Sequence, residues 1–250
     1  RASVRLAPFE DRVELRNAWF DEFFAGYAEP HAPTRILLDL GISGYHFGGS
    51  GRGFSFRGDE PLDMRLDPEA ERTAADLVNT WAEREIADVI YAYGEERYAR
   101  RIAERIVRER GAGRIATTGR LADIVWHAVP GKYRHGRIHP ATRTFQALRI
   151  AVNAELERLR RGLDAALSVL APGGRIGVIA FHSLEDRIVK QCFRSHDSRW
   201  KEPPNTPMSF NREPLVHVLT RKPLMPGEAE RGRNPASRSA RFRVAQRLEH

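Results

Sequence analysis

The side chain with the clearest chemical potential is an acid near the end of an apolar run. Residues 35–40 read RILLDL, a pattern typical of a buried parallel strand, and Asp39 lies just before Gly41. Ligands of open α/β sheets gather at the carboxyl ends of the strands, so a carboxylate there can accept hydrogen bonds from a bound molecule. The alternative is that Asp39 caps nearby backbone N–H groups.

A second polar group follows another apolar run, RIGVIAF at 175–181. The next residues, 182–187, read HSLEDR and contain the residue types of a Ser-His-Asp triad. Adjacent residues at one strand end cannot form the hydroxyl–imidazole–carboxylate line, so we exclude a hydrolase of this kind. Ser183 with Asp186 fits a capping box that starts a helix, and His182 and Arg187 are candidates for substrate contact.

The composition indicates a folded protein with an excess of positive charge. The 250 residues are 41% hydrophobic and 30% charged, which leaves room for one large domain or two smaller ones. The formal net charge is +8, and nearly all the cations are arginines, which bind phosphate through two parallel hydrogen bonds. We therefore expect an RNA partner. The alternative is a set of solvated surface arginines.

Other classes of protein are disfavoured by what the sequence lacks. No apolar run approaches the roughly 20 residues that span a bilayer, and no secretory signal opens the chain. The single cysteine, Cys192, excludes an internal disulfide framework and a multi-cysteine zinc site. We expect a cytoplasmic protein with no membrane contact and no metal, in which Cys192 is a small buried apolar residue.

The elements expected around these residues alternate between strands and helices. Further strand candidates are residues 13–15, 216–220 and 242–244. Apolar spacing predicts helices over residues 73–91, 95–110, 118–128, 142–170 and 183–193, with Thr118 as a cap. The segment 203–214 is rich in turn residues and is expected to be an exposed loop. These patterns predict an α/β domain over 1–50 and 141–247 that is interrupted by a helical insertion over 51–140.

Six stretches occur in the order found in one known family. They are DLGIS at 39–43, GRGFSF at 51–56, PLDMRLD at 61–67, HPATRTFQALRIAVNAELE at 139–157, FHSLEDRIVK at 181–190 and RNPASRSARFRVAQR at 233–247. Together they cover nearly the whole chain, which resembles the bacterial family of small-subunit (16S) rRNA cytosine-N4-methyltransferases. A long amphipathic helix followed by LAPGG at 170–174 and an apolar strand is also typical of Rossmann-like methyltransferases.

The resemblance implies a Rossmann-like sheet and S-adenosylmethionine (SAM) as the cofactor. Phe20, Asp39 and His46 match positions that contact SAM, with Phe20 packing against adenine and Asp39 also bordering the target amine. The family usually has glutamine where this chain has His46, which still offers a donor or an acceptor. For Phe20 and His46 the alternatives are a core aromatic residue and a solvated loop histidine.

The resemblance also implies small-subunit rRNA or the 30S particle as the partner, with methylation of a cytidine near the decoding centre. The residues expected to contact the RNA are Arg52, Phe54, His139, Arg143, Gln146, His182 and Arg187. Arginines 231, 233, 238, 241 and 243 form a candidate phosphate track. Each has a structural alternative: Phe54 as a buried loop ring, His139 at a helix start, and the carboxyl-terminal arginines as a solvated edge.

Some family features are not found in this sequence. The glycine-rich loop and the acid that binds the SAM ribose would precede Arg1, so we expect the first strands of the sheet to be missing and SAM binding to be poor. Residues 248–250 resemble the start of a purification tag. Two other functions stay open, an amino-methyltransferase for another nucleic acid and a non-catalytic RNA-binding assembly factor. Monomer and homodimer are both possible.

Overall fold

The computed structural model describes residues 2–199 and 214–249 and divides into two compact units. The first unit comprises Arg1–Leu40 with Arg158–His250, and the second comprises Gly41–Glu157. The helical unit is therefore longer at both ends than the 51–140 expected from the sequence. At its carboxyl end the unit extends beyond residue 140 because Phe145 and Leu148 belong to the helical core.

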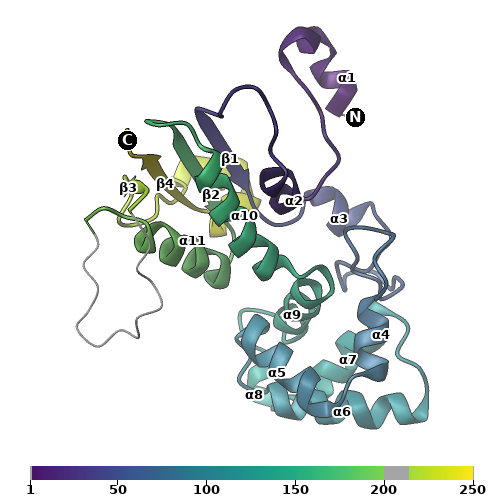
Figure 1. Cartoon of the computed structure of the whole chain (residues 1–250). Coiled ribbons are helices and arrows are strands. Elements are labelled where there is room, and N and C mark those ends of the chain that lie inside the picture. The colour runs from purple at the N-terminus through teal and green to yellow at the C-terminus, as the bar shows by residue number, and fades with distance from the viewer. Residues whose placement is uncertain (1, 200–213, 250) are drawn as a thin grey trace. The chain divides into compact units, whose positions relative to one another are not determined.

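The first unit is built on a four-stranded sheet with the order β1-β2-β4-β3 (Figure 1). Its strands are β1 (Arg35–Asp39), β2 (Arg175–Ala180), β3 (Val216–Val218) and β4 (Arg241–Arg247). Strands β1 and β2 are parallel, whereas β4 is antiparallel to both of its neighbours. The strand expected at 13–15 does not form. Val13 and Leu15 are both exposed, so no burial stabilises an extended segment there.

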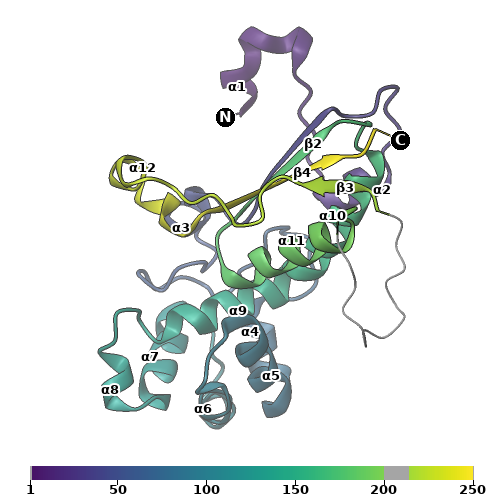
Figure 2. The ribbon, with the colours of Figure 1, turned by 90° about the vertical axis from the view of Figure 1, so that its left-hand side faces the viewer.

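The apolar run of β1 is divided between two faces of the sheet. Ile36 and Leu38 are buried, whereas the alternate residue Leu37 is 65% exposed. Helices α10 (Glu155–Val169) and α11 (Ser183–Ser195) lie along one face of the sheet (Figure 2). This one-sided cover explains why the strand is not buried on both faces, as its continuous apolar sequence predicts.

The remaining elements of the first unit are short. They are α1 (Ala2–Leu6), η1 (Ala7–Arg12), α2 (Phe20–Ala25), α12 (Glu228–Arg233) and η2 (Pro235–Ser239). Helix α11 begins at Ser183 as expected, but its cap is a different pair of residues. The His182 ring accepts from the backbone N–H of Glu185, and the Glu185 carboxylate accepts from the backbone of His182. The prediction of a capping box from Ser183 and Asp186 was therefore wrong, because the capping pair lies one residue earlier in the sequence.

The second unit is helical, as the apolar spacing predicts. It contains α3 (Gly44–Gly48), α4 (Ala74–Thr80), α5 (Glu83–Gly94), α6 (Ala99–Ala112), α7 (Thr118–Ala128), α8 (Gly131–Arg134) and α9 (Ala141–Asn153). Its core includes Leu62, Ile90, Ile102, Leu121 and Leu148. Helix α7 is capped by Thr117, not by Thr118, whose hydroxyl is buried and donates to the carbonyl of Gly58.

Two of the helices expected from the sequence are broken in the structure. The first ends at Thr80 and resumes at Glu83 because Trp81 and Ala82 are extended. The second is interrupted at Ala154, whose φ of 49° lies in the left-handed region. Apolar spacing alone cannot show such a break, because both segments keep their apolar stripe.

Within the described residues, every helix is too short or too polar to cross a bilayer. The loop expected at 203–214 lies outside the described residues, apart from its last position.

Candidate functional site

Asp39 lies at the carboxyl end of β1, where the sequence places it. The residue is exposed, and its backbone is in register with Ile179 of β2. Its side chain forms no hydrogen bond or ion pair with any residue that the structure describes. Gly41 follows with a φ of 87°, a conformation that glycine adopts without strain, so the chain turns directly after the strand. An exposed carboxylate with all its acceptor capacity unused is therefore available to a ligand.

Phe20 is the first residue of α2, and its ring packs on the bare backbone of Gly162 in α10. A Cβ atom at position 162 would lie only 2.1 Å from Cε2 of Phe20. Glycine is thus required for the close approach of the two helices. The sequence marks Gly162 only as an isolated glycine inside a helical pattern, a signal that often has a packing cause.

A buried ion pair fixes α2 beside this contact. Asp21 is 3% exposed and accepts hydrogen bonds from Arg158 at 3.0 Å and from Arg161 at 2.7 Å. Burial by itself raises the pKa of Asp21, but the hydrogen bonds from the two arginines outweigh it and leave the pKa below its usual value. The guanidinium of Arg158 also lies 4.2 Å from the ring centre of Trp19. Asp21 thereby positions the neighbouring Phe20.

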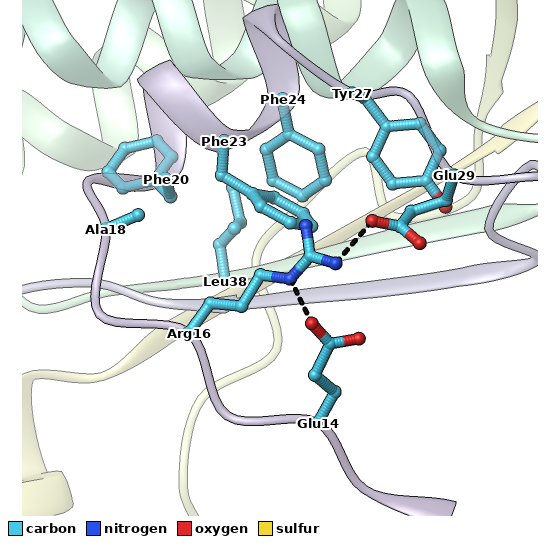
Figure 3. Close-up of a pocket in the computed structure, with 9 residues that line it drawn as sticks. All are labelled: Glu14, Arg16, Ala18, Phe20, Phe23, Phe24, Tyr27, Glu29 and Leu38. Carbon is cyan, nitrogen blue, oxygen red and sulfur yellow. Dashed lines mark hydrogen bonds and ion pairs between the residues drawn. The ribbon is translucent and has the colours of Figure 1, made fainter.

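A pocket of about 420 Å³ lies beside Phe20 (Figure 3). Aromatic and charged side chains share its walls, and its lining residues are Glu14, Arg16, Ala18, Phe20, Phe23, Phe24, Tyr27, Glu29 and Leu38. Arg16 pairs with Glu14 at 2.5 Å and with Glu29 at 2.6 Å. Asp39 does not line this pocket, because it alternates with Leu38 along the strand.

His46 lies in α3 of the helical unit and caps that helix. Its Nδ1 accepts from the backbone N–H of Ser43 at 3.2 Å, which leaves the proton of a neutral ring on Nε2. Burial, and then the positive charge of Arg52, lowers the pKa of His46. A neutral imidazole with a donor at Nε2 keeps one capability of the glutamine that is usual at this position.

The loop expected to clamp RNA is built into the helical unit. Phe54 is 5% exposed and belongs to the core, so its ring has no free face for a base. The guanidinium of Arg52 donates to the carbonyls of Arg65 and Leu66 at 2.8 and 3.2 Å. The structure therefore gives both residues a packing role, and RNA contact by Arg52 stays a prediction.

The PLDMRLD segment at 61–67 anchors this loop. Asp63 forms a bidentate pair with Arg65. The side chain of Asn153 accepts from the N–H of Leu66 at 2.7 Å and donates to the carbonyl of Met64 at 2.8 Å. Asn153 was missed by sequence reasoning, although a polar residue on the apolar stripe of a helix is a signal for such a role.

His139, Arg143 and Gln146 lie around the start of α9, as expected. His139 is sandwiched between the rings of Trp126 and Phe56, with centroids 5.2 and 4.7 Å away. Arg143 donates to the carbonyl of Glu95, and Gln146 donates to the carbonyl of Tyr93. Arg143 and Gln146 thus share a face and tie α9 to the end of α5. Their contact with RNA stays a prediction.

His182 and Arg187 flank the start of α11 in the first unit. The His182 Nε2 atom lies 3.1 Å from the Glu185 carboxylate, and its ring is engaged in the cap. Arg187 is exposed. The prediction that Arg243 belongs to a phosphate track was wrong. Arg243 is 5% exposed, and its guanidinium donates hydrogen bonds to both carboxylate oxygens of Asp186. An arginine neutralised in this way is not available to a phosphate.

The absence of a metal stays a prediction. Asp164, Cys192 and His196 offer ligand atoms that all lie within 4.8 Å of one another, a cluster that sequence reasoning missed. Cys192 is half-buried, and its Sγ lies 3.7 Å from the Asp164 carboxylate.

Together, these features define a class of protein. The sheet is mixed, and an acid lies at the carboxyl end of one of its parallel strands, with a pocket lined by aromatic rings beside that strand. A helical unit interrupts this domain in the sequence. The combination is typical of a Rossmann-like methyltransferase. Residues 1–248 match the MraW methylase family, and the chain belongs to that family. The family uses SAM as its methyl donor, so the resemblance, fold class and cofactor predicted from the sequence are confirmed.

Similar proteins share most of this sequence. The ribosomal RNA small subunit methyltransferase H of Treponema denticola is 54% identical over 252 residues, which cover 100% of this chain and 80% of that protein. The protein of the same name from Syntrophotalea carbinolica is 52% identical, with 99% and 80% covered. That from Synechococcus elongatus is 49% identical, with 99% and 76% covered.

The residues present are suited to parts of SAM. The aromatic rings around Phe20 suit a flat purine ring, and the exposed carboxylate of Asp39 suits hydroxyl or ammonium groups. His46 offers a neutral donor. Contact of these three residues with SAM stays a prediction.

Proposed function

We propose that this protein transfers a methyl group from SAM to the N4 amine of a cytidine in small-subunit rRNA, near the decoding centre. The names of its relatives support the substrate class. We place the enzyme in the cytoplasm, where a ribosomal RNA substrate would be found. The observation that carries the proposal is the exposed carboxylate of Asp39 at the end of β1, which pairs with no other residue in the described part of the chain.

The cytosine amine is a poor nucleophile because its lone pair is delocalised into the ring. A carboxylate that accepts hydrogen bonds from the amine N–H groups fixes its orientation, which is the contribution we assign to Asp39. Bound SAM supplies an electrophilic methyl group. As the family resemblance implies, Phe20 would hold the adenine ring, and the Nε2–H of His46 would be a donor to the cofactor. The target base must be unstacked, since the amine is poorly reachable inside a paired stem.

The test is transfer of labelled methyl from SAM to unmodified 30S particles, with duplex DNA as the competing substrate. Digestion to nucleosides and mass spectrometry should find N4-methylcytidine in the small-subunit rRNA. Label in DNA instead would favour an amino-methyltransferase for another nucleic acid. RNA binding without any heat of SAM binding would favour an assembly factor without catalytic activity.

A further inference from the structure

The helical unit contains a basic pocket of about 570 Å³ between the start of α6 and the segment that joins α7 to α9. Four cations line it: Arg97, Lys132, Arg137 and Arg143. No lining residue is a carboxylate. Among the described residues, Arg97, Lys132 and Arg137 form no ion pair, so their positive charge is not balanced within the unit. Such a pocket favours an anion.

Arg97 is held in place by two rings. Its guanidinium carbon lies 4.8 Å from the ring centre of Tyr98 and 4.9 Å from that of Tyr133. The two rings meet edge to face, with centroids 4.9 Å apart. A guanidinium placed over rings keeps its N–H groups available in its plane. This arrangement suits bidentate donation to a phosphate, with less loss of side-chain entropy than a free arginine.

A buried acid holds this arrangement from behind. Glu96 is completely buried and accepts from the Tyr133 hydroxyl at 2.5 Å and from the Tyr98 backbone N–H at 2.9 Å. Its carboxylate also lies 3.9 Å from Arg143. Burial, and then the hydrogen bond to Glu96, raises the pKa of Tyr133, so its hydroxyl remains a donor. Glu96 thus orders both tyrosines and Arg143.

We propose that this pocket binds a phosphodiester group of the RNA strand that carries the target cytidine, an inference that rests on the proposed function. Arg97, Lys132 and Arg137 are the ligands of the phosphate, and Tyr133 is a positioning residue. An acidic protein segment is a different occupant, but the planar fork of Arg97, held over two rings, favours bidentate donation to a phosphate.

The test uses the whole chain and a short single-stranded RNA. Lys132→Gln with Arg137→Gln should weaken RNA binding about tenfold and lower the slope of log affinity against log salt by about 1. The matched control is Arg72→Gln with Arg108→Gln, which removes the same charge from two exposed arginines of the same unit outside the pocket. Tyr133→Phe should raise the KM for RNA while kcat and SAM affinity stay unchanged.

Equal loss of RNA affinity in the pocket variant and the control overturns the proposal, since net charge alone would then explain it. The proposal is also overturned if the pocket variant loses affinity for polyglutamate but keeps its affinity for RNA. If Tyr133→Phe fails to fold, hydrogen exchange of residues 130–139 with and without RNA replaces it, and protection is expected. A wild-type protein that methylates no cytidine refutes the proposed function instead, whatever the pocket variants do.

Discussion

Replacing Gly162 by alanine tests whether the close packing of α2 on α10 positions Phe20. The added Cβ would lie 2.1 Å from Cε2 of the ring. Carbon atoms in contact are separated by about 3.6 Å, so the ring must retreat by about 1.5 Å. Overpacking of this kind costs about 1–3 kcal/mol, and alanine in a helix returns about 1 kcal/mol relative to glycine. The net loss of stability is therefore at most about 2 kcal/mol.

The effect on cofactor binding should be larger than the effect on folding. A displaced Phe20 no longer packs against adenine, and we expect SAM affinity by calorimetry to fall about tenfold, or about 1.4 kcal/mol. Gly111→Ala is the matched control, because a Cβ there meets no atom within 4 Å. That variant should keep its SAM affinity and gain stability. Unchanged SAM affinity in Gly162→Ala would refute the role given to Phe20.

Two further predictions concern stability. Asp21→Asn removes the carboxylate that Arg161 contacts and leaves Arg158 paired only with the exposed Glu22. It should lower the free energy of unfolding by about 1–3 kcal/mol in urea titrations, a value discounted because Arg161 is largely exposed and Arg158 keeps one partner; a loss below about 0.5 kcal/mol would contradict it. Burial lowers the pKa of His46 and His139 from 6.5. As the pH falls, these two imidazoles therefore bind protons in the unfolded chain before they do so in the folded protein. The stability that the neutral histidines allow is fully present above pH 6.5 and is lost as the pH falls from 6.5 through the lower pKa values of the folded state. Urea midpoints should be lower at about pH 5.5 than at about pH 7.5, and less so in His46→Gln; equal midpoints would refute this.

The strands and most of the helices could be predicted from the sequence because each buries a regular apolar pattern. The acid at the end of β1 could be predicted for the same reason, since the strand's own residues place it. The breaks at Trp81 and Ala154 could not. Contacts between distant residues accompany them, such as the hydrogen bonds that Asn153 donates to the Met64 carbonyl and accepts from the Leu66 N–H.

Some residues of the candidate site could be predicted from the sequence, but the contacts that hold them could not. Family resemblance indicated Phe20, but only the packing shows that Gly162 and Asp21 hold it. Residue type alone suggested RNA contacts for Phe54 and Arg243, and both are buried. A phenyl ring or a guanidinium looks the same in sequence whether it faces solvent or a partner inside the protein. The pocket around Arg97 was missed because its cations come from separate segments.

The most direct measurement for the central claim is the single-turnover rate of methyl transfer by Asp39→Ala at saturating SAM. Because the Asp39 side chain is exposed and has no partner within residues 2–199 and 214–249, its removal should leave the fold and the RNA affinity unchanged. The account predicts that the rate falls by about a hundredfold or more. A rate within a few-fold of the wild-type value would show that the cytosine amine does not depend on this carboxylate.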